Sequence, residues 1–153
     1  MTYDVQLDEA RPRPLAVVRR RAPAQDLSTV VPQACGEVWE ALRALKTERP
    51  GRHVAVYLDG EINLEVGVEV AESFVGDGHV IRSATPAGLV ATAAHIGPYH
   101  GLHGAHRAIR EWCKSHGHGI DGPNWEIYGH WTDDLSKLRT DVFYLLKPAT
   151  RRA

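Results

Sequence analysis

The sequence predicts a single α+β domain in which a strand–helix–strand–strand module occurs twice. Three observations support this fold class. The length of 153 residues is typical of one domain. Apolar residues alternate in several short segments, as in strands, and recur with helical spacing in two longer ones. The order of these segments in the first half returns in the second, so we expect an antiparallel sheet with two main helices on one face and a cleft at the pseudo-two-fold junction.

The first half contains one predicted helix among four predicted strands. The helix rests on apolar residues at steps of four, three, four and three from Val31 to Leu45, and Pro32 suits its first turn. The last strand alternates cleanly, with Leu64 and Val66 on one face and Glu65 on the other. The predicted elements are strands 3–9 and 15–21, helix 31–46, and strands 53–58 and 62–70.

The second half repeats this order. Gly97 and Pro98 open its helix, and Gly117 ends it. The apolar face of this helix consists of Leu102, Ala105, Ile109, Trp112 and Cys113, and the strands are 88–96, 124–131 and 140–146. One domain over 1–153, built from pseudo-repeats at roughly 3–75 and 79–148, follows from this pattern.

Composition excludes several classes of protein. The 18 basic and 19 acidic residues give a net charge of −1, whereas a general nucleic-acid binder is normally basic. No apolar run approaches the length of a membrane helix, and the N-terminus has no secretory h-region. Two cysteines, Cys35 and Cys113, fit a reducing compartment and exclude a cysteine-based zinc module. We expect a cytoplasmic protein with no cofactor and no nucleic-acid or membrane partner.

Several short motifs carry a family resemblance over nearly the whole chain. In the second half they are Ala94-His95-Ile96-Gly97-Pro98-Tyr99, Trp112, Trp125-Glu126-Ile127-Tyr128, Thr140-Asp141-Val142 and Leu145-Leu146-Lys147-Pro148, and in the first half Leu64-Glu65-Val66-Gly67-Val68. In their order and spacing they resemble the gyrase-inhibitor-like, or AraC-type effector-binding, superfamily. Its members are ligand domains of multidrug-sensing transcription activators, and some stand alone.

The resemblance implies a tandem repeat around a pocket for apolar, often cationic, aromatic ligands. It also implies a buried glutamate at the base of that pocket, which maps onto Glu126. This chain shows no helix-turn-helix pattern, so we expect a stand-alone pocket.

Strand alternation singles out Glu126 independently. Trp125, Ile127 and Trp131 share one face, which we expect to lie under the helix. Glu126, Tyr128 and His130 share the other, open face. A carboxylate in an aromatic strand is costly to bury unless it is paired, and an organic cation would pair it. The alternative is a glutamate that faces solvent.

Further aromatic and imidazole side chains are candidates for ligand contact. Tyr57 and Tyr128 hold matching positions in the two halves, and Tyr144 comes from the last strand. Core packing is the alternative for each aromatic residue. The candidate ligand-binding residues are Glu126, Tyr128, Tyr57, Tyr144, Tyr99, Trp39, His95 and His130.

The chain has nine histidines, and seven lie between positions 95 and 130. His100, His103 and His106 follow one another at steps of three on the second predicted helix. Two of them could share a face and bind a transition metal. No acidic partner has matching spacing, so we favour solvated histidines and predict no metal site.

Two functions from different classes fit these residues. The first is a binding protein that senses or sequesters a lipophilic, planar, cationic compound. The second is a hydrolase that opens strained cyclopropane rings of genotoxic natural products, a function the resemblance suggests, with Glu126 as general base. A protein partner such as gyrase ranks last. The predicted edge strand 3–9 leaves homo-oligomerisation open.

Overall fold

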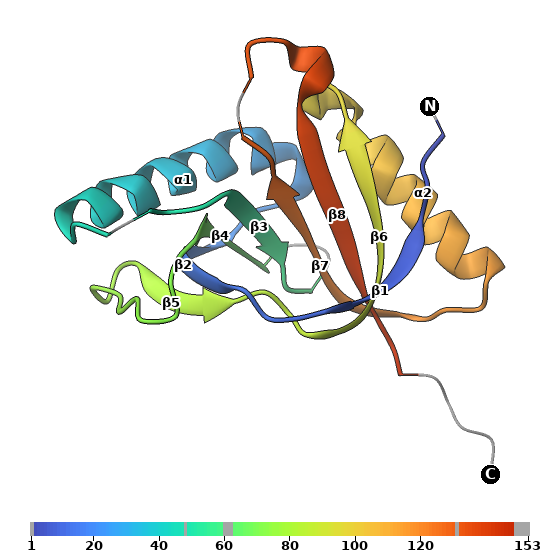
Figure 1. Ribbon diagram of the computed structural model, residues 1–153, viewed down its shortest axis with the longest axis horizontal. Coiled ribbons are helices and arrows are strands. Elements are labelled where there is room, and N and C mark those ends of the chain that lie inside the picture. Colours follow the sequence, from blue (N-terminus) through green and yellow to red (C-terminus); the bar gives the residue numbers. More distant parts are fainter. Residues whose placement is uncertain (1, 48, 60–62, 131, 149–153) are drawn as a thin grey trace.

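The computed structural model describes residues 2–47, 49–59, 63–130 and 132–148. Within them, eight strands form one antiparallel sheet in the order β1-β6-β8-β7-β3-β4-β2-β5, with two α-helices (Figure 1). The predicted α+β class is confirmed. No helix in the described part of the chain is long and apolar enough to cross a membrane.

The observed elements follow the predicted order with one addition, the short strand β5. The strands are β1 (Gln6–Ala10), β2 (Pro14–Arg21), β3 (His53–Tyr57), β4 (Asn63–Glu69), β5 (Ile81–Ala84), β6 (Gly88–Ile96), β7 (Ile120–Tyr128) and β8 (Arg139–Leu146). The helices are α1 (Leu27–Ala44) and α2 (Leu102–Ser115), with one-turn 3-10 segments η1 (Ala24–Asp26), η2 (Tyr99–Gly101) and η3 (Leu135–Lys137).

Each half forms a four-stranded unit that borrows its outer strand from the other half. β1 precedes β2 in the chain but pairs with β6, and β5 precedes β6 but pairs with β2. Helix α1 packs on β2 and β4, and α2 packs on β6 and β8 (Figure 1). The two units meet where β3 pairs with β7.

The β3–β7 pairing locates a pseudo-two-fold axis. Ala55 lies opposite Glu126, and the register is symmetric about this pair, because Val54 faces Ile127 and Val56 faces Trp125. The axis therefore passes between Ala55 and Glu126. Tyr57 and Tyr128, each two residues further along its strand, occupy equivalent positions in the two halves.

Helix α1 begins at Leu27, earlier than the sequence suggested, because η1 leads directly into it. Pro32 therefore lies inside the helix rather than in its first turn. The buried residues are Ala34, Val38 and Leu42, at steps of four. The predicted stripe also included Val31 and Cys35, but these two line a cavity. The apolar sector of α1 thus packs on the sheet along one edge and lines the cavity along the other.

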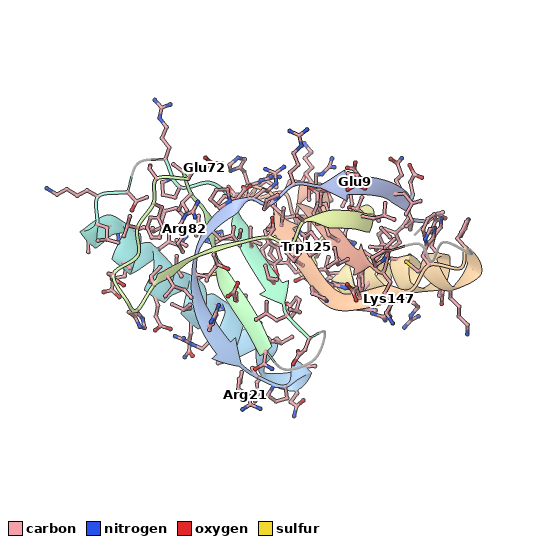
Figure 2. All side chains as sticks on the ribbon, turned by 90° about the horizontal axis from the view of Figure 1, so that it is seen from below. Glu9, Arg21, Glu72, Arg82, Trp125 and Lys147 are labelled. Atoms are coloured by element: carbon pink, nitrogen blue, oxygen red, sulfur yellow. The ribbon has the colours of Figure 1, made fainter. Side chains whose placement is uncertain are left out.

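The predicted assignment of the two faces of β7 is wrong. Trp125 and Ile127 lie in an apolar cluster separate from those that contain residues of α1 and α2. This cluster contains Leu15, Val17, Val54, Val56, Val90, Trp125 and Ile127. Trp125 lies near the centre of the molecule, stacked on Phe143 with ring centroids 5.3 Å apart (Figure 2). Trp131, predicted to share this face, falls outside the described residues.

The assignment of the two faces of β7 is wrong because both faces of the sheet are buried. Strand β2 from one half and β6 from the other both contribute to the cluster around Trp125. Alternation identifies the residues that share a face, but with two apolar faces it does not identify the one under the helices. Glu126 and Tyr128 consequently face the helices, and the cleft lies on the helix side of the sheet instead of the open side.

Candidate functional site

A cavity of about 910 Å³ lies between α1, the β3–β7 junction and the start of α2. Its aromatic lining consists of Trp39, Tyr57, Tyr99 and Tyr128. Leu27, Val31, Pro32, Cys35 and Leu102 add an apolar wall. This size and this mainly apolar lining are typical of small-molecule sites.

One carboxylate, that of Glu126, lies in this lining, with only 5% of the residue exposed. Its Oε1 accepts hydrogen bonds from the Tyr128 hydroxyl at 2.6 Å and the Tyr57 hydroxyl at 3.1 Å. Its Oε2 contacts Nε2 of His106 at 2.6 Å. These three bonds make the burial of the carboxylate tolerable. Because Tyr57 and Tyr128 are equivalent positions, one acid on the axis receives a hydroxyl from each half.

The two tyrosine hydroxyls remain protonated at physiological pH. Burial raises the pKa of Tyr57, and the neighbouring Glu126 raises it further. Burial and Glu126 likewise raise the pKa of Tyr128 well above its ordinary value. Both side chains therefore act as neutral donors that hold the carboxylate without cancelling its charge.

Behind the carboxylate, a hydrogen-bonded chain runs through His106 to Arg110. The Arg110 guanidinium donates to the Tyr144 hydroxyl oxygen at 3.1 Å, and that hydroxyl lies 2.7 Å from Nδ1 of His106. A neutral His106 with its proton on Nε2 satisfies every contact, because Tyr144 then donates to Nδ1 and Nε2 donates to Glu126. Among the described residues, no Lys or Arg pairs directly with Glu126.

At another part of the cavity wall, Trp39 contacts His53. The indole Nε1 donates to Nε2 of His53, and the rings meet edge to face with centroids 5.6 Å apart. Burial lowers the pKa of His53. The adjacent Arg52 also lines the cavity, but its guanidinium is held by Glu69 at 2.8 Å and lies 3.9 Å from Asp141.

Six of the eight predicted ligand-binding residues line the cavity, namely Glu126, Tyr128, Tyr57, Tyr99, Trp39 and His130. Tyr144 does not, because it lies behind His106. His95 does not either. It is 3% exposed and lies between the Tyr3 hydroxyl, at 2.8 Å, and the Pro98 carbonyl, at 2.9 Å, so it supports the turn before Tyr99.

Polar residues of the cavity or its hydrogen-bond network that the sequence did not predict as ligand contacts include His106, His53, Arg52 and Cys35. His106 was grouped with solvated histidines, and the structure corrects this, because it faces Glu126 while His103 faces solvent. A signal was present. His106 is half-buried and lies at steps of four, three and four with the buried residues Leu102, Ile109 and Cys113.

Cys35 offers a chemical probe of the cavity. Burial raises the pKa of its thiol to about 11. In a Cys113→Ala variant, we expect the rate of iodoacetamide modification to rise about tenfold per pH unit from pH 7 to 10, because only the thiolate reacts. Intact-mass spectrometry measures this rate. A plateau near pH 8.5, the ordinary thiol range, would contradict the buried environment.

An antiparallel sheet with a helix-covered, aromatic cavity that contains a buried acid is the architecture of a small-molecule-binding domain. The family model for the GyrI-like small molecule binding domain matches residues 3–147, so the chain belongs to that family. The resemblance noted in the sequence is thereby confirmed. No curated protein sequence matches the chain.

Solved structures share this fold at low sequence identity. The EcmrR C-terminal domain is 20% identical with a TM-score of 0.82, and the match covers 97% of this chain and 100% of that one. The EcmrR chain in an EcmrR–DNA complex is 19% identical with a TM-score of 0.80, and the match covers 96% of this chain and 58% of that longer one. SAV2435 bound to tetraphenylphosphonium is 13% identical with a TM-score of 0.69, over 97% and 95%. A hydrolase from Listeria innocua is 11% identical with a TM-score of 0.60, over 94% and 91%.

Proposed function

We propose that the protein binds lipophilic aromatic cations in the cavity, with Glu126 as their counter-charge, and that it thereby senses or sequesters them. The observation that carries this proposal is the Glu126 carboxylate itself. It is almost wholly buried, it lies among aromatic rings, and its hydrogen-bond partners are two neutral tyrosines and His106. Among the described residues no Lys or Arg pairs with this carboxylate, so a bound organic cation can act as its counter-charge.

The physical chemistry of the wall favours the same ligand class. A large organic cation is weakly hydrated, so entering an apolar cavity costs it little, and Tyr and Trp faces attract it through cation–π interaction. An anion of the same size would meet the field of Glu126. SAV2435, which shares the fold, was solved with such a cation, tetraphenylphosphonium. That precedent agrees with the proposal.

Two ions that share size and shape but differ in charge test the proposal. We expect calorimetry to show that tetraphenylphosphonium binds more than about 1,000-fold tighter than tetraphenylborate, because one buried charge at about 5–8 Å favours the cation and disfavours the anion by about 2–3 kcal/mol each. Neutral triphenylphosphine oxide should lie between them. Equal affinities for the two ions, or tighter binding of the borate, would contradict the charge selectivity.

The second candidate function is hydrolysis of strained rings. Three hydrogen bonds already occupy acceptor positions of Glu126, two on Oε1 and one on Oε2, so about one position on Oε2 is left to hold a water that the carboxylate would activate. The test is incubation with a cyclopropane-bearing alkylating compound and a mass measurement of the product. A product heavier by one water, formed over many turnovers, would favour the enzyme, whereas stoichiometric binding without product favours the binding protein.

A further inference from the structure

The cavity wall also contains His53, whose tautomer is determined by Trp39. An indole N–H only donates, so Nε2 of His53 must accept from it. An imidazole that accepts at one nitrogen is neutral and carries its proton on the other. His53 therefore has an N–H donor at Nδ1.

The neutral form of His53 is also favoured by its surroundings. Burial lowers the pKa of its ring. If Nε2 were protonated, its N–H would point at the indole N–H of Trp39, which is itself only a donor. At neutral pH, His53 thus adds a directional donor to the cavity wall without adding charge.

No described residue accepts a hydrogen bond from Nδ1 of His53. Nor is this atom sealed in the core, since Thr140 Oγ1 is the one fully buried side-chain polar atom without a partner in the described part of the chain. His53 lines the cavity. Its Nδ1–H is therefore open to accessible space, and a bound molecule can satisfy it.

The strand register relates this donor to the buried acid. Glu126 lies opposite Ala55, and His53 is two residues before Ala55 on the same strand and the same face. Such diagonal neighbours in an antiparallel pair have positions about 7–8 Å apart. One ligand can therefore place a positive centre toward Glu126 and an acceptor toward His53.

We propose that His53 determines specificity by donating from Nδ1 to the ligand, so that the cavity prefers aromatic cations that carry a neutral hydrogen-bond acceptor about one ring away from the charge. Carbonyl, ether and aromatic nitrogen groups fit this description. A carboxylate does not fit, because a second anion would lie near Glu126 and Arg52 is already paired. This inference rests on the proposed cation-binding function.

Two matched probes test it by calorimetry: (4-acetylphenyl)triphenylphosphonium and (4-isopropylphenyl)triphenylphosphonium, which differ in one carbonyl. We expect the wild type to bind the acetyl probe about threefold to tenfold tighter, the effect of one neutral hydrogen bond. His53→Phe keeps an aromatic ring beside Trp39 but has no donor, and should bind both probes equally. His53→Asn places an amide N–H where Nδ1 lies and should retain the preference. His79→Phe, an exposed histidine outside the cavity, is the control.

The possible results distinguish a failure of cation binding from a failure of the role proposed for His53. If neither probe binds the wild type, cation binding itself is wrong. If both bind the wild type equally, cation binding stands and the role of His53 is overturned, whatever the variants do. A preference that survives in His53→Phe would also overturn it, because another donor must then contact the carbonyl.

Discussion

Replacing Glu126 with Gln is expected to weaken tetraphenylphosphonium binding by about 30- to 150-fold. The change removes one negative charge and leaves the shape of the cavity intact. At an effective dielectric constant of about 20 and a separation of about 5–8 Å, that charge contributes about 2–3 kcal/mol to the binding of a monovalent cation. Titration followed by calorimetry or intrinsic tryptophan fluorescence measures the loss, and Trp39 in the cavity wall provides a local reporter.

The hydrogen bonds around position 126 can survive this substitution. The amide oxygen of Gln can accept from Tyr57 and Tyr128, as Oε1 of Glu126 does. The amide N–H₂ then faces Nε2 of His106, which becomes an acceptor if its proton moves to Nδ1. The Tyr144 hydroxyl oxygen then accepts a hydrogen bond from Nδ1–H of His106 instead of donating one to Nδ1. We therefore expect a folded variant whose defect lies in charge.

A matched control exists elsewhere in the molecule. Glu65 is also buried, with 3% of the residue exposed, but it lies on the face of the sheet away from the cavity, bonded to Arg19 and Ser83. Glu65→Gln should leave tetraphenylphosphonium affinity unchanged. If Glu126→Gln binds the cation as tightly as the wild type does, or if both variants lose the same affinity, Glu126 is not the counter-charge.

Replacing Gly67 with Ala should have the largest effect on stability, a loss of more than about 4 kcal/mol. Gly67 lies in β4 opposite Val17 of β2. A Cβ there would lie 1.7 Å from the carbonyl oxygen of Ala16 and 2.8 Å from Cα of Val17. Both are backbone atoms of a strand that is paired on both sides, so no side-chain rotation relieves the contact. β2 would have to separate from β4, disrupting the unit that supports α1 and its cavity wall.

Replacing Gly36 with Ala should instead increase the stability of the protein. Gly36 lies inside α1, and a Cβ there meets no heavy atom within 4 Å. Alanine should therefore stabilise the helix by up to about 1 kcal/mol. Urea unfolding followed by circular dichroism compares the two variants. A Gly67→Ala protein as stable as the wild type would show that β2 and β4 are not packed as described.

Much of the fold could be predicted because its signals are local. The two helices and most strands follow from apolar periodicity over a few residues. Strand β5 was missed because its four residues, Ile81–Ala84, are too few to show an alternation. The exchange of β1 and β5 between the halves was also missed. Strand pairing joins residues distant in sequence, and neither strand differs locally from one that pairs with its neighbour.

The same difference between local and long-range signals decided which site residues could be predicted. Glu126 was predictable because a carboxylate in an apolar strand is unusual by itself, and Tyr57 and Tyr128 because they match across the repeat. His106 and His53 acquire their roles only from partners on other elements, Glu126 and Trp39 respectively. Single-element periodicity shows that such a histidine faces inward but not what it meets there.

The position of the acid on the pseudo-two-fold axis has a consequence for the architecture of the site. In a homodimer built from one such module, an axial residue would face its own copy at about 4.5–5.5 Å, and two carboxylates there would repel each other. Joining the modules in one chain allows alanine at position 55 and glutamate at position 126. Covalent linkage thus frees the centre of a symmetric scaffold to hold a single charge, and the ligand it selects need have no symmetry of its own.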